Sequence, residues 1–297
     1  MAKLNTKLGK IELKNPIVLA SGILGTNVEI LNRCAANGCG AVTTKSIGPI
    51  EREGNKNPSV VEIGNGIYNA VGLPTPGYLN MDYEFEEWRQ IKVPLIVSIY
   101  GSSVDDYVAI TKYLQKYKPS MIELNISCPN KDDGMVFGKD KELTKKLVRA
   151  VKSVSLIPIM PKLTPNCDNI GEIALVCEKA GADAICAINT VQKELIHPEL
   201  KMPLLAYGKG GISGPIIRKI ALEKVKEVSA ATKLPILGLG GITYGKDAIE
   251  MIKAGASAVG IGSGVYFRGI DVFKKVNDEI LAIMKKEGYN SVEEIRR

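Results

Sequence analysis

Residues 254–264 read AGASAVGIGSG, and this stretch decides the fold. Gly255 lies just past a helical pattern, where the chain needs a residue with positive φ, and small residues then lead into a β-branched strand. The same form recurs as NGCGAV at 37–42 and as AGADAI at 180–185. The copies are spaced close to two and four units of about 36 residues. The chain is therefore predicted to repeat a strand–helix unit.

Short β-branched runs alternate with amphipathic helical patterns along the chain. Strands are predicted at Ile17–Ala20, Ala41–Lys45, Leu95–Ile99, Met121–Asn125, Pro158–Lys162, Ala184–Ile188, Pro235–Leu239 and Ala258–Gly262. Helices are predicted at Asn27–Asn37, Tyr78–Gln90, Val104–Tyr117, Asp140–Val154, Ile170–Ala180, Pro215–Ala231, Gly245–Ala254 and Asp271–Glu287. Eight such units predict an α/β fold, a (β/α)8 TIM barrel that forms a single domain over residues 1–297. A doubly wound open sheet is the alternative, because pattern alone does not establish closure.

Two connections are longer than a compact barrel requires. The first, Ile47–Gly77, contains a predicted hairpin around an Asn-Gly turn at Gly64-Asn65-Gly66. The second insertion is Thr190–Ser213. Long structured insertions at one face of a barrel usually serve ligand binding. We therefore expect both insertions at the C-terminal face of the barrel.

Composition narrows the class of protein. The 297 residues are 45% hydrophobic with a net charge of +7, which excludes a disordered or fibrous protein and suits anionic small ligands. The six cysteines form no C-x-x-C pair, which favours a reducing, cytoplasmic compartment. No signal peptide or membrane-spanning run is found, so a membrane is not an expected partner. The positive net charge weakly permits nucleic acid, but nucleic acid is not a predicted partner. The single histidine, His197, is interpreted as a loop residue, and no metal site is predicted.

Polar or backbone-exposing residues follow every predicted strand, where a (β/α)8 barrel builds its active site. Two of these residues are lysines, and an unpaired charge next to an apolar core is costly, which favours a bound ligand over surface positions in an open sheet. Glycines after the seventh and eighth strands indicate a phosphate site, although tight turns also select glycine. The strand-end residues are Ser21-Gly22, Lys45-Ser46, Ser98, Asn125, Lys162, Asn189-Thr190, Gly240-Gly241 and Gly262-Ser263.

Residues 123–130, ELNISCPN, carry the most chemistry. Cys128 comes just after a strand end and precedes the loop Lys131–Lys139, whose two glycines are possible hinges. A thiol near lysines can have its pKa lowered toward neutrality, so that it acts as a nucleophile or as a base under a closed loop. The alternative is an unreactive cysteine in a turn.

These residues together resemble the dihydroorotate dehydrogenase family in its soluble, cysteine-dependent class, over nearly the whole chain. The matching pieces are Asn15-Pro16, Ala20-Ser21-Gly22, Thr44-Lys45-Ser46, Asn69-Ala70-Val71-Gly72-Leu73, Asn125-Ile126-Ser127-Cys128-Pro129-Asn130, Lys162-Leu163-Thr164-Pro165, Ile188-Asn189-Thr190, Gly210-Gly211-Ile212-Ser213-Gly214-Pro215, Gly240-Gly241-Ile242 and Gly262-Ser263.

The resemblance implies an FMN enzyme that oxidises (S)-dihydroorotate to orotate in pyrimidine biosynthesis. It implies that Cys128 removes the C5 proton, that hydride from C6 passes to FMN N5, and that Lys162 stabilises negative charge near flavin N1. Lys45 would be a second catalytic residue. Substrate contacts implied are Lys45, Asn69, Gly72, Leu73, Asn125, Asn130, Asn189 and Thr190. Flavin contacts implied are Ala20, Ser21, Gly22, Lys45, Ser46, Ser98, Asn125, Lys162, Ile188, Ser213, Gly214, Gly240, Gly241, Gly262 and Ser263.

The resemblance also implies an electron acceptor. The Asn-Ile-Ser-Cys form and the C-terminal Glu293-Glu294-Ile295-Arg296 are similar to the NAD-linked branch, in which a partner subunit carries FAD and a [2Fe-2S] cluster. This chain has neither a dinucleotide-binding fingerprint nor a cysteine cluster of its own. We therefore expect a homodimer of this chain within a heterotetramer. A fumarate-linked homodimer is the alternative.

The chain departs from the family pattern at three places. Ser98 stands where many relatives carry asparagine, Lys193-Glu194 replaces Gly-Met, and Tyr207-Gly208-Lys209 replaces Asn-Lys-Thr. The departures near the rim could alter the electron acceptor or a partner contact. Other classes to weigh are a dihydropyrimidine dehydrogenase module, a tRNA-dihydrouridine synthase, which usually adds a helical RNA-binding domain, and a non-redox phosphate-binding barrel.

Overall fold

Eight parallel strands close into a barrel in the computed structural model, which describes residues 2–127 and 136–296. Closure of the sheet confirms the predicted (β/α)8 barrel and excludes the alternative of an open sheet. Each strand lies within two residues of its predicted bounds. Around the barrel the strands are β3 (Ile17–Leu19), β4 (Ala41–Thr43), β7 (Leu95–Ile99), β8 (Met121–Asn125), β9 (Ile159–Leu163), β10 (Ile185–Ala187), β13 (Ile236–Leu239) and β14 (Ala258–Ile261).

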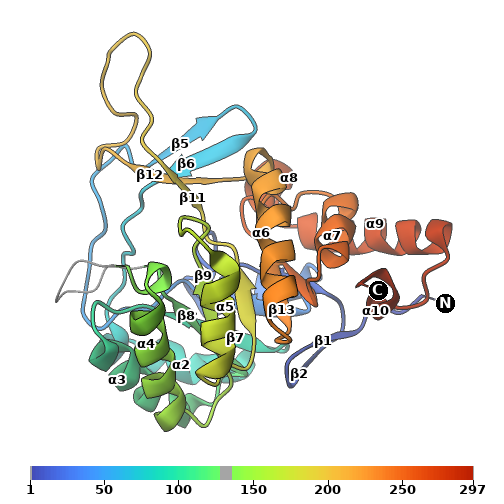
Figure 1. The fold of residues 1–297 in the computed structure, drawn as a ribbon, viewed down its shortest axis with the longest axis horizontal. Coiled ribbons are helices and arrows are strands. Elements are labelled where there is room, and N and C mark those ends of the chain that lie inside the picture. Colours follow the sequence, from blue (N-terminus) through green and yellow to red (C-terminus); the bar gives the residue numbers. More distant parts are fainter. Residues whose placement is uncertain (1, 128–135, 297) are drawn as a thin grey trace.

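Helices between these strands cover the outside of the barrel, as Figure 1 shows. Their apolar stripes follow the helical period: α4 buries Thr144, Leu147, Val148 and Val151 against the sheet. The helices are α1 (Val28–Ala36), α2 (Asp82–Glu87), α3 (Val104–Leu114), α4 (Lys141–Val154), α5 (Ile170–Lys179), α6 (Arg218–Ala231), α7 (Gly245–Lys253), α8 (Gly264–Arg268), α9 (Val272–Glu287) and α10 (Val292–Arg296). No helix in these parts of the chain is apolar for a length that would cross a bilayer.

The prediction of one continuous helix at Tyr78–Gln90 is wrong. Residues 78–90 form a 3-10 turn at Tyr78–Asn80, helix α2, and a second 3-10 turn at Trp88–Gln90. Met81 leaves the helical region, with φ −117° and ψ 16°, and this separates the first turn from α2. The segment buries only Phe85 and Trp88, so packing does not hold one long helix together here.

The repeated glycines occupy the conformation that the sequence predicts. Gly38, Gly181 and Gly255 have φ of +105°, +97° and +114°. Each ends a helix and turns the chain into the next strand, where a side chain at such a φ is strained. The repeat is therefore a structural device of the barrel, and it positions no site residue.

An unpredicted hairpin, β1 (Thr6–Leu8) and β2 (Ile11–Leu13), closes the N-terminal end of the barrel. Leu8 and Leu13 are buried in one cluster with strand residues that point into the barrel, among them Met121 and Met160. Ligands therefore reach the interior from the opposite end. Three-residue strands alternating buried and exposed positions are too short to stand out from sequence alone.

Removing a side chain from this hairpin should destabilise the whole barrel. We expect Leu13→Ala to lower the free energy of unfolding by about 2–5 kcal/mol, because it leaves a cavity against the barrel interior. Its neighbour Glu12 is exposed and forms a surface ion pair with Lys7, so Glu12→Ala should cost less than about 1 kcal/mol. Equilibrium denaturation of both variants measures the difference, and equal losses would contradict the role of the hairpin.

The two insertions form one four-stranded antiparallel sheet in the order β11-β12-β6-β5. Its strands are β5 (Val60–Ile63), β6 (Gly66–Asn69), β11 (Val191–Lys193) and β12 (Gly210–Ser213). The hairpin exists as predicted, but its two-residue turn is Gly64-Asn65, because Ile63 pairs with Gly66 and Gly64 takes the positive φ of +61°. Figure 1 shows these four strands together at the top of the view, away from β1 and β2.

Candidate active site

A cavity of about 650 Å³ lies between the carboxyl ends of the barrel strands and the inserted sheet, within the usual size range of a small-molecule site. The structure brings most of the predicted site residues together on its wall. These are Ala20, Ser21, Gly22, Lys45, Ser46, Asn69, Gly72, Leu73, Asn125, Lys162, Ile188, Asn189, Thr190, Ser213, Gly214, Gly240, Gly241, Gly262 and Ser263. Val60, Glu62, Ser127, Ile217 and Tyr266 also line the cavity and were missed from sequence.

The outcome differs for the three remaining predicted site residues. Cys128 and Asn130 lie outside the residues that the structure describes. Ser98 is fully buried in β7 and is absent from the lining. Of the other departures from the family pattern, Lys193 ends β11 and Tyr207 is exposed, and neither lines the cavity.

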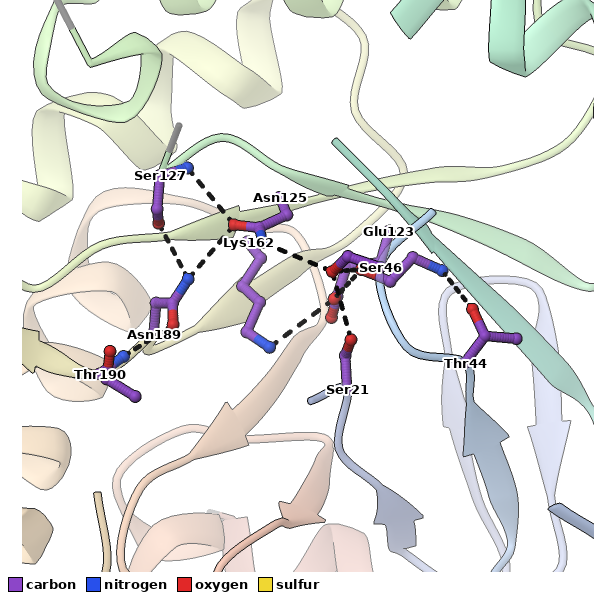
Figure 2. A network of polar contacts seen from close by, with 10 residues as sticks. Ser21, Thr44, Ser46, Glu123, Asn125, Ser127, Lys162, Asn189 and Thr190 are labelled. Atoms are coloured by element: carbon purple, nitrogen blue, oxygen red, sulfur yellow. Dashed lines mark hydrogen bonds and ion pairs between the residues drawn. The ribbon is translucent and has the colours of Figure 1, made fainter. Parts of the chain in front are cut away.

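Side-chain amides form the polar part of the cavity (Figure 2). Asn189 Nδ2 donates to Asn125 Oδ1 at 3.3 Å and to Ser127 Oγ at 2.9 Å. Backbone N–H groups fix which amide atom is the oxygen, since the Ser127 N–H donates to Asn125 Oδ1 and the Thr190 N–H donates to Asn189 Oδ1. The donors and acceptors of this wall are thus ordered before any ligand arrives.

The inserted sheet supplies the opposite wall. Asn69 Nδ2 at the end of β6 donates to the Gly211 carbonyl oxygen at 3.2 Å, which ties the two insertions together. Gly72 and Leu73 follow with φ of +83° and +55°. A Cβ on Gly72 would stand 2.7 Å from the Asn55 backbone nitrogen, so only glycine fits this close turn. The turn aims the backbone of this loop at the cavity.

Lys162 and Glu123 form an ion pair inside the barrel, with 3.7 Å between Nζ and Oε1. Burial is the largest influence and lowers the pKa of Lys162, but the groups that face it, Glu123 first and then Cys186, together raise that pKa, so the ammonium is retained. Lys162 ends at the cavity, whereas Glu123 lies deeper, with 1% of its surface exposed. No role was predicted for Glu123 from sequence, although a carboxylate in the apolar strand MIELN is itself a signal of function.

Lys45 brings a second positive charge to the cavity. Partial burial lowers its pKa, and no nearby carboxylate in the described segments contributes to that shift. An ammonium held in this way is stabilised by an anion placed in the cavity. Two lysines on one wall therefore favour a ligand that carries negative charge.

Buried serines connect the ion pair to the cavity wall (Figure 2). Ser98 Oγ donates to Glu123 Oε1 at 2.8 Å, because a carboxylate only accepts. Its single proton is then used, so Ser46 donates to Ser98 over 2.9 Å and accepts from Asn125 Nδ2 at 3.4 Å. The Glu123 carboxylate inside the barrel thus sets the donor–acceptor direction of this series of hydrogen bonds. Ser98 thus supports the wall from below.

The glycine end of the cavity suits a phosphate. Gly240 and Gly241 have φ of +126° and +75°, and a Cβ on Gly241 would lie 2.8 Å from the Cβ of Arg218 and 2.9 Å from the Gly214 oxygen. A Cβ on Gly262 would meet only Ala20, at 3.7 Å. Within the parts of the chain described, the N–H groups of Gly241 and Ser263 donate to no acceptor. Backbone donors beside glycines are what an anion binds in barrels of this type.

The fold and the site together define an α/β barrel whose cavity has side-chain amides on one wall and glycine backbone at the far end. A family model described as dihydroorotate dehydrogenase matches residues 3–284. The chain therefore belongs to the dihydroorotate dehydrogenase family and is an oxidoreductase, which confirms the sequence prediction.

Curated relatives match the chain over almost its full length. The chain is 46% identical to the dihydroorotate dehydrogenase B (NAD(+)) catalytic subunit of Methanocaldococcus jannaschii over 297 residues, covering 98% of this chain and 96% of the relative. It is 43% identical to the protein of the same name from Pyrococcus abyssi over 295 residues, covering 98% and 97%. It is 40% identical to that of Thermoplasma acidophilum, covering 99% and 98%.

Proposed function

We propose that this chain is the catalytic subunit of an FMN-dependent dihydroorotate dehydrogenase that oxidises (S)-dihydroorotate to orotate in pyrimidine biosynthesis. The observation that carries the proposal is the joint placement of Asn69, Asn125, Asn189 and Lys45 on one cavity whose far end is built from glycines. Amides match a planar diamide ring, and the lysine matches its carboxylate. All of residues 1–297 would form one catalytic domain in the cytoplasm.

The residues present fit FMN. The backbone N–H groups of Gly241 and Ser263 would hold its phosphate, and Gly240, Gly262 and Gly214 would let the backbone approach it. Lys162 would hold negative charge beside the ring, and Ser21, Ser46 and Ile188 would contact its edge. When bound, FMN supplies the hydride acceptor, and the protein supplies position and charge. Ala20, Gly22, Asn125 and Ser213 complete the proposed contacts.

The substrate would lie against the amide wall. Asn69, Asn125 and Asn189 would pair with its ring amides, while Lys45, Thr190 and the Gly72-Leu73 backbone would hold the rest. The resemblance assigns removal of the C5 proton to Cys128 and a further contact to Asn130. Holding the C5–H bond against a positioned base supplies the geometry that proton transfer needs.

Electrons would leave this chain through a partner. The relatives named above are catalytic subunits of an NAD(+) enzyme, which supports a separate partner subunit for this chain as well. The resemblance assigns FAD and a [2Fe-2S] cluster to that partner, in a heterotetramer built on a dimer of this chain. Turnover of the isolated chain with fumarate, and none with NAD and the partner, would contradict the proposal and favour a fumarate-linked homodimer.

The visible spectrum of the purified chain tests the proposal. Recorded without oxygen, it should show flavin bands that bleach on addition of dihydroorotate, because hydride transfer reduces the flavin, and that stay unchanged with dihydrouracil. Flavin bands that bleach only with dihydrouracil would assign another pyrimidine as substrate. A colourless chain that takes up no added FMN would overturn the proposal.

A further inference from the structure

Four neighbouring strands of the barrel place polar side chains in one buried layer beneath the cavity. Ser98 comes from β7, Glu123 from β8, Lys162 from β9 and Cys186 from β10. All are at most 6% exposed. Only Lys162 lines the cavity, so the other three act on the site through it or through Ser46.

Glu123 is the centre of this layer. Its carboxylate accepts a hydrogen bond from Ser98 Oγ at 2.8 Å and lies 3.7 Å from Lys162 Nζ. The Cys186 thiol also interacts with it, and burial raises the pKa of that thiol well above its ordinary value, so Cys186 stays neutral. In the described segments, Glu123 is the one carboxylate paired with Lys162.

A buried lysine keeps its charge only while a counter-charge is present, since burial favours the neutral amine. Cys186 is neutral and Ser98 carries no charge, so neither replaces the carboxylate. The apolar residues below, among them Met160 and Ile96, offer no polar group and exclude water from that side. The charge that Lys162 presents to the cavity therefore depends on Glu123.

We propose that Glu123 is a positioning residue, which holds the positive charge of Lys162 at the floor of the cavity from a place where it touches neither flavin nor substrate. The inference deepens the proposed function, because it assigns to Glu123 control of the charge beside the flavin ring. The proposal predicts how Glu123 affects the titration of Lys162 whether or not the flavin is bound.

Titration of Lys162 in the flavin-free full chain tests the proposal directly. The chain is labelled with ¹³C at lysine Cε, and Lys162→Arg identifies the Lys162 signal. The groups that face Lys162 are Glu123 on β8 and Cys186 on β10. We expect Glu123→Gln to lower the proton affinity of Lys162 by about 10³–10⁵-fold, the range that full burial gives an unpaired lysine, so that the side chain is largely neutral at neutral pH. Glu123→Asp, which keeps a more distant charge, should lower it less. Identical titration in the wild type and both variants would overturn the proposal.

The redox equilibrium of bound FMN gives a second test. The direction in which it shifts distinguishes a charge effect from a packing effect. At a fixed electrode potential, Glu123→Gln should shift bound FMN about tenfold toward the oxidised form, roughly the effect of one charged hydrogen bond, because Lys162 loses its charge. If Lys162 stayed charged without Glu123, losing the carboxylate would shift FMN toward the reduced form. That opposite sign, or no shift, would contradict the proposal.

The same substitution in a chain that already carries Lys162→Met is the matched control. In Lys162→Met, the further change Glu123→Gln should produce no shift toward oxidised FMN, because there is no lysine charge left to lose. The same shift in both backgrounds would show that Glu123 acts independently of Lys162. A wild-type chain that takes up no added FMN would refute the proposed function, whereas the lysine titration decides the role of Glu123 in either case.

Discussion

Replacing Cys128 with serine should slow reduction of the bound flavin by dihydroorotate by about a hundredfold or more at neutral pH. A positioned general base contributes about 10²–10⁴ to a rate, and a hydroxyl is a far weaker base than a thiolate. FMN should stay bound, because the substitution changes none of the residues proposed to hold it. Anaerobic stopped-flow measurement of flavin bleaching gives the rate.

Cys167→Ser is the matched control for this variant. Cys167 is partly exposed, donates to the Thr164 carbonyl oxygen at 3.3 Å, and does not line the cavity. Burial raises the pKa of its thiol. Its replacement should leave the rate of flavin reduction unchanged. A Cys128→Ser chain that reduces flavin at the wild-type rate would remove Cys128 from the role of base.

Replacing Lys162 with alanine should lower stability and function together. It leaves Glu123 as a buried, unpaired carboxylate, and breaking a buried pair in this way costs about 3–5 kcal/mol. It also removes the proposed positive charge beside the flavin, so either FMN retention or flavin reduction should be impaired. Chemical denaturation gives the first effect, and flavin content with bleaching rate gives the second.

Two further variants separate these effects. Lys141 pairs with Glu172 on the surface, where both side chains are more than half exposed, so Lys141→Ala should cost less than about 1 kcal/mol. The double change Lys162→Met with Glu123→Leu should recover stability, because apolar residues can replace a buried pair, without recovering flavin reduction. Wild-type stability, flavin content and bleaching rate in Lys162→Ala would show that the assignment of Lys162 is wrong.

Much of the barrel was predictable because its signals are local. Glycines with positive φ after helices, as at Gly181, and β-branched strands such as 95–99 specify their own conformations. The hairpin formed by β1 and β2 was not predicted, since its strands gain stability only from the end of the barrel that they cover. The break at Met81 was missed for a related reason, because tertiary packing rather than the periodic pattern decides where that helix begins.

The candidate site was predictable where residues end strands. Asn125 ends β8 and Lys162 lies one residue before the end of β9, so barrel geometry alone brings them to one end. Ser98 lies one residue before the end of β7, but its side chain donates to Glu123 inside the barrel. The sequence does not show on which side of the cavity floor such a side chain lies. Ser127 and Tyr266 reach the cavity through tertiary placement, which no local pattern encodes.

The four-stranded sheet over the cavity couples the site to the completion of folding. Asn69 and Gly211, which it joins, lie 142 residues apart in the chain. Contacts between such distant segments form late, because the intervening chain must first be ordered. A growing polypeptide that ends before β12 lacks one wall of the cavity. Any ligand that touches both insertions therefore binds only after both have folded, and its binding stabilises the folded barrel relative to the unfolded chain.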